Sequence, residues 1–289
     1  MKKLSGVFIC LLLFTFISSA RIIEVADAGI TDKLRAVIAA KNAGGAPAAT
    51  DYTAHANAMG AWFMNSNSGD DTDQTGNGNL LTEYVTSDIP TSATVPAGYS
   101  GTSRDIELGD AEWLLVADAT ELDINGQVDI TVCIWIYPES LAATMVPISK
   151  WSSTDTDRQY MLIVQNDTGY KAQFWVSSDG TTAGGSGFTS TTFNTATWYH
   201  LCGVYDDDEG SGNNVQIWVN GVRENTGAFT AGLNDGGREF RVGCRDDSGT
   251  RLFFDGLVDE AIVFNTALNS TQINEIKNSG IDGSKGAND

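Results

Sequence analysis

From Ala58 onward, the sequence consists of short runs of β-branched and aromatic residues separated by clusters of Gly, Asn, Asp, Ser and Thr. The chain holds 31 glycines and only 5 prolines, a balance typical of all-β proteins. The clearest predicted strands are residues 130–137, 159–165, 170–176, 197–205, 215–219, 240–244 and 252–264. No repeat of 20 to 50 residues is visible, which disfavours solenoids and propellers. The pattern therefore predicts one antiparallel β-sandwich of two sheets over residues 58–278.

Two local signals refine this fold. Asn220-Gly221 lies between two apolar runs and predicts a tight hairpin, because both turn residues tolerate positive φ. Asn269 and Gln272 have the spacing of a capping box and predict a short C-terminal helix that packs on the sandwich.

The first twenty residues predict a secretory signal peptide. Lys2 and Lys3 precede an apolar run at residues 4–17, which ends on small residues at 18–20. A bilayer span needs about 20 apolar residues, so an uncleaved anchor is the weaker alternative. We therefore expect a secreted or cell-surface protein with no membrane insertion after cleavage.

The remaining ends of the chain differ from the strand-rich part. Apolar residues at helical spacing predict a short N-terminal helix at residues 29–42, within a helix-plus-linker segment at 21–57. This helix could pack on the domain, face a partner or drive self-association. Residues 279–289 are expected to form a flexible tail.

The charge excludes some partners. There are 17 Lys and Arg against 37 Asp and Glu, a net charge of −20, and cleavage would remove Lys2 and Lys3 and make it −22. Such a surface repels nucleic acid and anionic membranes and attracts divalent cations.

Three cysteines lie beyond the leader, at Cys133, Cys202 and Cys244, each in a predicted strand. Their spacing has no metal or redox motif. One internal disulfide and three buried thiols are both compatible with it.

Four stretches, taken together, resemble the laminin-G-like, concanavalin A-like lectin/glucanase jelly-roll family. They are residues 60–64 with 73–79, 130–138, 198–206 with 216–221, and 254–260 with 267–268. Their order and spacing match the family over residues 58–278. The fold hosts lectins, adhesion modules, hydrolases and lyases, so the resemblance implies a fold and leaves the ligand open.

A calcium site is the metal hypothesis. Asp73 and the loop that contains Gly76 and Asn79 offer the oxygen ligands that Ca²⁺ prefers. In related concanavalin-like domains, the first-strand loop and the closing strand share a structural calcium, and the resemblance implies this role for Asp73 and Asp259.

Glycan binding needs exposed aromatic faces flanked by amides or carboxylates. Trp151 and Trp175, with Asp155 and Asp157, are the candidate ligand-binding residues, although both tryptophans are also compatible with core packing. Trp62, Trp135, Trp198 and Trp218 lie on family core strands.

Catalysis is not expected. A retaining glycosidase needs two carboxylates about 5 to 5.5 Å apart, typically on one strand with the pattern E-x-D-x-E or E-x-D-x-x-E. Glu121-Leu122-Asp123 starts this pattern, but the chain continues Ile124-Asn125-Gly126, without the second glutamate. A lyase base would have to come from His55 or His200, and His200 lies at a family strand position.

The sequence thus predicts a non-catalytic binding module that recognises polysaccharide or glycoprotein glycan and holds a structural calcium. The alternatives are a structural or adhesive surface or virion component without glycan specificity, and a glycoside hydrolase of the same fold.

The calcium hypothesis predicts that a chelator lowers the melting temperature. At a calcium concentration near 100 times the dissociation constant, binding would stabilise the native state by about 2.7 kcal/mol. Thermal unfolding with EDTA and after calcium is restored measures this effect, and identical melting curves would count against the site.

Overall fold

The computed structural model describes residues 49–285, apart from residues 68, 85–87, 120, 121, 125, 127, 128, 153–155, 211, 248 and 249. The predicted signal peptide at residues 1–20 and the predicted helix at 29–42 lie outside the described residues. The part described belongs to a compact unit that begins at Ala49.

Two large antiparallel sheets make up this unit. Across the eight-stranded sheet the order is β13 (Val222–Gly227), β12 (Val215–Val219), β11 (Tyr199–Tyr205), β6 (Ile130–Pro138), β17 (Gly256–Phe264), β4 (Ser103–Ile106) and β3 (Thr91–Ser92), and β1 (Ala58–Trp62) also pairs with β17. Across the seven-stranded sheet the order is β10 (Ala183–Gly185), β9 (Lys171–Gly180), β8 (Arg158–Gln165), β7 (Met145–Lys150), β14 (Phe240–Val242), β5 (Leu114–Val116) and β2 (Thr82–Glu83).

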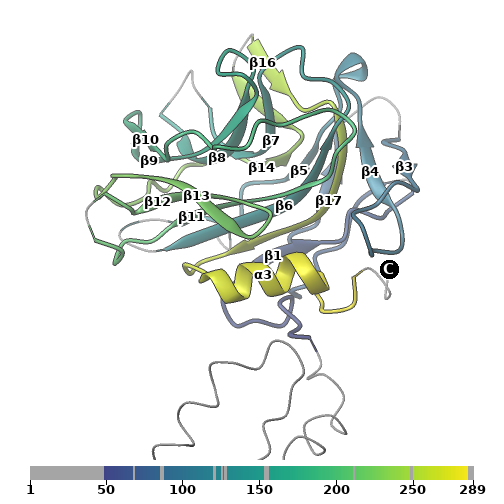
Figure 1. Ribbon diagram of the computed structural model, residues 1–289, viewed down its shortest axis with the longest axis horizontal. Helices are drawn as coiled ribbons and strands as arrows, with labels where there is room; N and C mark the ends of the chain where they lie inside the picture. The colour runs from purple at the N-terminus through teal and green to yellow at the C-terminus, as the bar shows by residue number, and fades with distance from the viewer. Residues whose placement is uncertain are drawn as a thin grey trace, which may run out of the picture. The chain divides into compact units, whose positions relative to one another are not determined.

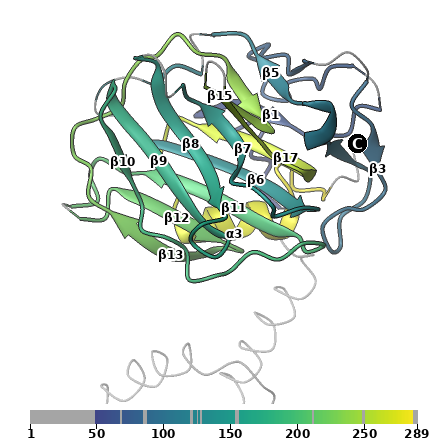
Figure 2. The same ribbon diagram turned by 90° about the horizontal axis from the view of Figure 1, so that it is seen from above.

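The sheets stack face to face, with smaller elements on their outer sides (Figure 1). Helix α3 (Ser270–Ser279) lies against the eight-stranded sheet, and the hairpin of β15 (Cys244–Asp247) and β16 (Thr250–Phe253) projects beyond the seven-stranded sheet. A short 3-10 turn, η1 (Leu108–Asp110), precedes β5. Figure 2 shows strands β7 to β10 of one sheet lying across β6, β11 and β12 of the other. The predicted two-sheet sandwich is confirmed.

Alternation along the strands builds the core between the sheets. In β6, Ile130, Val132, Ile134 and Ile136 belong to the buried central cluster, while the residues between them face the outer side. Period-two alternation sends successive side chains to opposite faces. Burying an Ile side chain contributes about 1.5–3 kcal/mol, so this one strand is a major anchor of the sandwich.

Close packing between the sheets depends on one glycine in particular. A Cβ atom at Gly203 in β11 would lie 2.2 Å from the ring of Phe174 in β9, on the facing sheet. A side chain there would collide with the ring, so the small residue lets the two layers approach.

The outer face of the eight-stranded sheet is covered by α3. Ile273 and Ile276 of the helix are buried in a cluster with Trp218 and Phe264. The Asn269 side chain accepts from the Thr271 and Gln272 backbone N–H groups, and the Gln272 side chain accepts from the Asn269 N–H, so the predicted capping box is confirmed. None of the helices in the described part of the chain has the length and hydropathy needed to cross a bilayer.

A disulfide joins β6 to β11 under that helix. Cys133 and Cys202 are direct cross-strand partners and are bonded, at a sequence separation of 69, while Cys244 is buried outside the bond. Of the two alternatives, the single disulfide is therefore found. Closing a loop of this length stabilises the fold by about 4 kcal/mol in the chain-entropy description.

The domain extends beyond its predicted limits at both ends. Tyr52 is buried, and its backbone N–H donates to the Ile281 carbonyl. Ile281, placed by the sequence in the flexible tail, is buried in the same cluster as α3. The apolar side chains on both segments explain the difference, because they complete the cover of the outer face.

The observed strands differ from the predicted ones. Strand β7 and several short edge strands lie outside the predicted ranges, and in β7 a register shift between Met145 and Ile148 accommodates Pro147. The predicted strand at 252–264 is two strands, β16 and β17, separated at Phe254 and Asp255. The Asn220-Gly221 hairpin is confirmed, with φ of 50° and 79° at its two residues.

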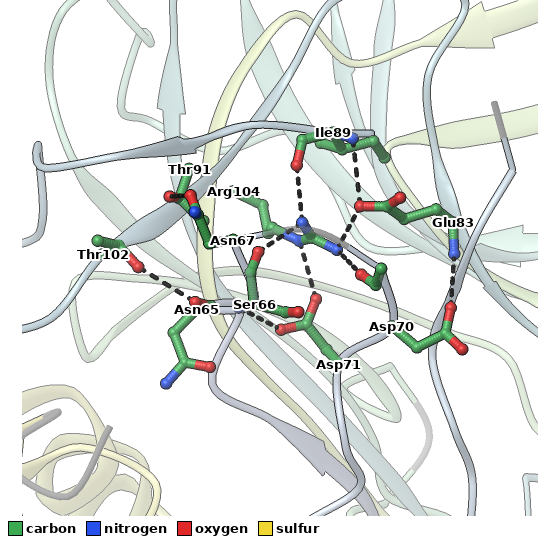
Figure 3. Close-up of polar contacts among 11 residues, drawn as sticks. Asn65, Ser66, Asn67, Asp70, Asp71, Glu83, Ile89, Thr91, Thr102 and Arg104 are labelled. Carbon is green, nitrogen blue, oxygen red and sulfur yellow. Dashed lines mark hydrogen bonds and ion pairs between the residues drawn. The ribbon is translucent and has the colours of Figure 1, made fainter. Parts of the chain in front are cut away.

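The open edge of the sandwich is closed by a buried arginine. Arg104 of β4 is fully buried, and its Nε lies 2.9 Å from Asp71 Oδ2, while its Nη2 lies 2.8 Å from Glu83 Oε1 (Figure 3). Glu83 belongs to β2 of the other sheet, so the guanidinium joins the two layers.

Backbone carbonyls complete the shell of this guanidinium. Nη1 donates to the Ser66 and Ile89 carbonyl oxygens at 2.6 and 2.7 Å, and Nη2 also donates to the Gly69 carbonyl (Figure 3). Burial raises the pKa of Asp71, and the Arg104 charge offsets part of that rise. The arginine therefore fixes both neighbouring loops while its own charge is neutralised.

Replacing Arg104 should lower the stability of the fold strongly. Arg104→Met leaves Asp71 and Glu83 buried without their cation, so we expect a loss of about 3–5 kcal/mol in the free energy of unfolding, with Arg104→Lys intermediate. Urea unfolding of the two variants measures this loss.

The matched control is Arg223→Met. Arg223 pairs with Glu209 at 3.0 Å on the surface, and exposed pairs contribute at most about 1 kcal/mol. Equal losses for the two methionine variants would show that the Arg104 network is not a main support of the fold.

Candidate functional site

A hollow of about 290 Å³ opens beside the Arg104 network. It is lined by Phe63, Asn65, Ser66, Asp70, Asp71, Thr72 and Gln74 and is called the polar hollow below. The loop that forms it follows β1 and returns beside β2, where Asp71 and Leu81 form an antiparallel bridge. Asp71 Oδ1 accepts from the Ser66 backbone N–H at 3.1 Å, which ties the two sides of the loop together.

The polar hollow offers both donors and acceptors. Asp70, Thr72 and Gln74 are exposed, whereas Asp71 is buried at the base against Arg104. Hydroxyl and amide groups can donate as well as accept, and the carboxylates accept. Such a lining suits a ligand rich in hydroxyl groups.

A stack of aromatic rings lies on the outer face of the seven-stranded sheet, near the same edge. Tyr84 is 52% exposed, and its ring stacks on Trp113 with centroids 4.1 Å apart and an interplanar angle of 23°. Phe253 lies 5.9 Å from Trp113, and the Arg251 guanidinium lies 4.8 Å from the Trp113 ring centroid. These four residues are called the aromatic shelf.

Strand pairing places the aromatic shelf. Strand β2 pairs with β5, with Glu83 opposite Leu114. Leu114 belongs to the central core and Glu83 points inward to Arg104, so their neighbours Trp113 and Tyr84 face outward. Strand β16 of the hairpin supplies the other two side chains. Arg251 and Phe253 are two residues apart on this strand, so they face the same side.

The polar hollow and the aromatic shelf adjoin. The Glu83 backbone N–H donates to Asp70 Oδ1 at 3.3 Å, and Tyr84 follows directly in sequence (Figure 3 shows the first contact). Trp113 and Tyr84 are not among the residues that the sequence singles out. Trp113 next to a short apolar run is the available signal in the sequence. Its exposed partner, Tyr84, follows β2 and is distant in sequence.

The Asp73 loop is organised by hydrogen bonds. Asp73 Oδ1 accepts from the Ala61 and Thr75 N–H groups and the Thr75 hydroxyl, at 3.1, 3.0 and 2.8 Å, and Oδ2 accepts from the Asn79 N–H at 3.0 Å. The Asn79 side chain turns to the Met59 carbonyl, and Gly76 has positive φ. Four hydrogens occupy positions where a cation would have to approach Asp73, so this carboxylate fits calcium poorly.

Asp259 lies elsewhere. It is buried on β17 opposite Trp135 of β6. Burial and Glu260 raise the pKa of Tyr99, and Asp259 adds a smaller effect. Ala61 of β1 bonds to the Asp73 loop through both its N–H and its carbonyl, so β1 separates that loop from β17. The structure does not bring Asp259 to Asp73, and calcium stays a prediction.

Of the predicted ligand residues, Trp151 follows β7, Asp157 precedes β8 and Trp175 lies on β9. Trp151 is only 3% exposed and packs edge-on against Trp175 at 6.3 Å, so its core interpretation holds and its face is closed to a ligand. Trp175 keeps part of its ring at the surface. Asp157 lies 3.9 Å from Arg238, and Asp155 lies outside the described residues.

Three carboxylates converge at the ends of β4 and β6, where the sequence showed no pattern. Oxygens of Asp105, Glu107 and Glu139 lie within 4.8 Å of one another. Burial and neighbouring carboxylates, Asp255 among them, raise the pKa of all three. Strand pairing brings them together, since Gly256 lies opposite both Ile106 and Pro138.

His200 is not placed to act as a base. His200 is fully buried beside the Cys202 sulfur, and burial, with a smaller effect of Lys277, lowers its pKa to about 3. The buried imidazole is therefore separated from any ligand at the surface.

Neutralising one acid of this cluster should stabilise the fold. A carboxyl whose pKa is raised on folding contributes stability below its unfolded pKa and loses it as the pH rises through the folded value. Glu107→Gln should therefore raise the free energy of unfolding at pH 7 by about 0.5 kcal/mol, after screening of these partly exposed charges, with the gain vanishing near pH 4. Urea unfolding across this range checks it. Asp167→Asn, at an exposed turn, is the control. An equal gain in the free energy of unfolding for Asp167→Asn would show that the carboxylate cluster is not the cause.

The chain matches one family of known proteins. Residues 108–274 match the family Laminin_G_3, described as the concanavalin A-like lectin/glucanases superfamily. No curated protein sequence matches the chain.

Several solved structures share the architecture. Domain 4 of AbnA, a GH43 extracellular arabinanase from Geobacillus stearothermophilus, in complex with arabinotriose, has 18% identity and a TM-score of 0.56 over 76% of this chain and 98% of that one. The binding domain of Paraclostridial Mosquitocidal Protein 1 has 12% identity and a TM-score of 0.57, over 77% and 52%. The binding domain of Botulinum Neurotoxin DC in complex with SialylT has 12% identity and a TM-score of 0.53, over 78% and 52%.

The match to the toxin domains covers about half of their length, and at these identities the likeness concerns the fold. The family match spans more than half of the chain and includes most strands of both sheets. The chain therefore belongs to the concanavalin A-like lectin/glucanase superfamily.

Proposed function

We propose that this protein is a secreted or surface-displayed, non-catalytic module that binds glycan through the aromatic shelf. The observation that carries the proposal is the half-exposed ring of Tyr84, held flat by its stack on Trp113. An exposed ring whose orientation is fixed from below is an efficient platform for the apolar face of a sugar, because little conformational freedom is lost on binding.

The surroundings of Tyr84 complete the chemistry of a sugar site. Arg251 can donate to hydroxyl groups, and the acids and amides of the polar hollow adjoin on the other side. Specificity at such a site comes from a few polar groups placed around an apolar surface.

The comparisons support a binding role. The AbnA domain was solved with arabinotriose and the neurotoxin binding domain with SialylT. The first is a domain of an extracellular arabinanase and the second is the binding domain of a toxin, and we carry a binding role to this chain as a hypothesis.

Export is supported by two independent features. The first twenty residues have the pattern of a signal peptide. The Cys133–Cys202 disulfide suits an oxidising compartment. Calcium remains a prediction from the sequence, tested by chelation.

A hydrolase is the second candidate, and one observation favours it. The oxygens of Asp105, Glu107 and Glu139 lie close enough for an acid pair of the retaining type. Release of reducing sugar that is lost in Glu139→Gln would establish this activity, and would replace the non-catalytic proposal.

Removing the Tyr84 ring should weaken glycan binding. Tyr84→Ala is expected to lower affinity by about tenfold, or about 1.4 kcal/mol, whereas Tyr84→Phe keeps the ring and most of the affinity. Affinity electrophoresis in gels containing arabinan, xylan or β-glucan measures the change.

Phe188→Ala is the matched control. Phe188 is 36% exposed and its carbonyl accepts from Asn225, which lies on β13 at the opposite edge of the sandwich. Equal retardation of Tyr84→Ala and wild type would contradict the assignment of the site. Retardation by no polysaccharide would contradict glycan binding itself.

A further inference from the structure

We propose that the polar hollow is a second sugar subsite beside the aromatic shelf, so that the ligand is an extended neutral glycan chain and not a single terminal sugar. This inference rests on the proposed function. It names the class of glycan and the residues that would read its length.

The side chains of Asp71 and Glu83 point inward and set the geometry of the site. Arg104 holds the buried carboxylates of Asp71 and Glu83 on the inner side of the sandwich edge. Alternation then turns their neighbours outward, so that Asp70 and Thr72 flank Asp71, and Tyr84 follows Glu83.

The register places these outward residues side by side. Asp71 bridges to Leu81 in an antiparallel arrangement, so Asp70 lies opposite Thr82, two residues from Tyr84. The hydrogen bond from the Glu83 N–H to Asp70 Oδ1 confirms the proximity. One glycan chain crossing the edge could therefore touch both groups.

The size of the polar hollow indicates one sugar unit. At about 290 Å³ it falls at the lower limit of small-molecule pockets. It suits a single ring and not a whole oligosaccharide, so a longer ligand would gain the rest of its contacts from the adjoining shelf.

The charges select the kind of sugar. Asp70 lies exposed in the polar hollow, and the net charge of the chain is −20. Sulfated and uronic-acid chains would meet like charge here, whereas neutral hydroxyl groups can donate to the carboxylate.

The site is preorganised. Arg104 fixes the carbonyls of Ser66 and Gly69, and Asp73 fixes the turn that follows Gln74 through Thr75 and Asn79. A lining held by buried hydrogen bonds loses little freedom on binding.

Titration calorimetry with the full chain tests the inference. The probes are arabinose and linear arabino-oligosaccharides up to the hexasaccharide, with xylo- and gluco-oligosaccharides of the same lengths in parallel. We expect the trisaccharide of the preferred series to bind at least about tenfold more tightly than its monosaccharide.

Two variants locate the second subsite. Gln74→Ala and Asp70→Asn should remove most of the gain in affinity with chain length, and they should lower the affinity for the monosaccharide much less than Tyr84→Ala does. Asparagine keeps the acceptor for the Glu83 N–H, so the fold is expected to survive, as thermal unfolding will show. Asp70→Asn should also narrow the preference for neutral over uronic-acid oligosaccharides, and Asp167→Asn is the matched control for charge.

The outcomes separate the two proposals. Binding of no glycan in any series overturns both. Binding that depends on Tyr84 but does not increase with length, or that increases equally in Gln74→Ala and Asp70→Asn, overturns the second subsite and leaves the first. Loss of the length effect in these variants alone supports it.

Discussion

A fully buried guanidinium at the edge of the sandwich is the interaction on which the surface described above depends. A charge removed from water must be neutralised and hydrogen-bonded, and Arg104 achieves this with Asp71, Glu83 and three backbone carbonyls. Because Asp71 precedes β2 and Glu83 lies within it, the same contacts join β4 of one sheet to the edge strand β2 of the other. The neighbouring side chains are turned outward by the same constraint.

This arrangement separates the work of folding from the work of recognition. The inner faces of the sheets are apolar and closely packed, and the outer face of the eight-stranded sheet is covered by α3. The outer side of the β2 edge carries an exposed aromatic ring, hydroxyls, amides and carboxylates instead. A superfamily that hosts both lectins and glucanases does not fix the ligand, so function has to be argued from such surfaces.

The sequence allowed the sandwich to be predicted because alternation in long strands such as β6, the Asn220-Gly221 turn and the Asn269 cap are local signals. The site could not be predicted in the same way. Tyr84 and Trp113 meet through the pairing of two very short strands, and Trp151 looked like a platform until packing showed its face closed. Asp73 has the ligand chemistry of calcium, yet backbone N–H groups surround it, and only the fold could show that.

A crystal structure of the protein with a bound neutral oligosaccharide tests the central claim most directly. With arabinotriose, or the trisaccharide of whichever series binds best, one sugar ring should lie flat on Tyr84 and the next should reach Asp70 and Gln74. A ligand bound beside Trp175, or among Asp105, Glu107 and Glu139, with the Tyr84 ring uncovered, would contradict the account.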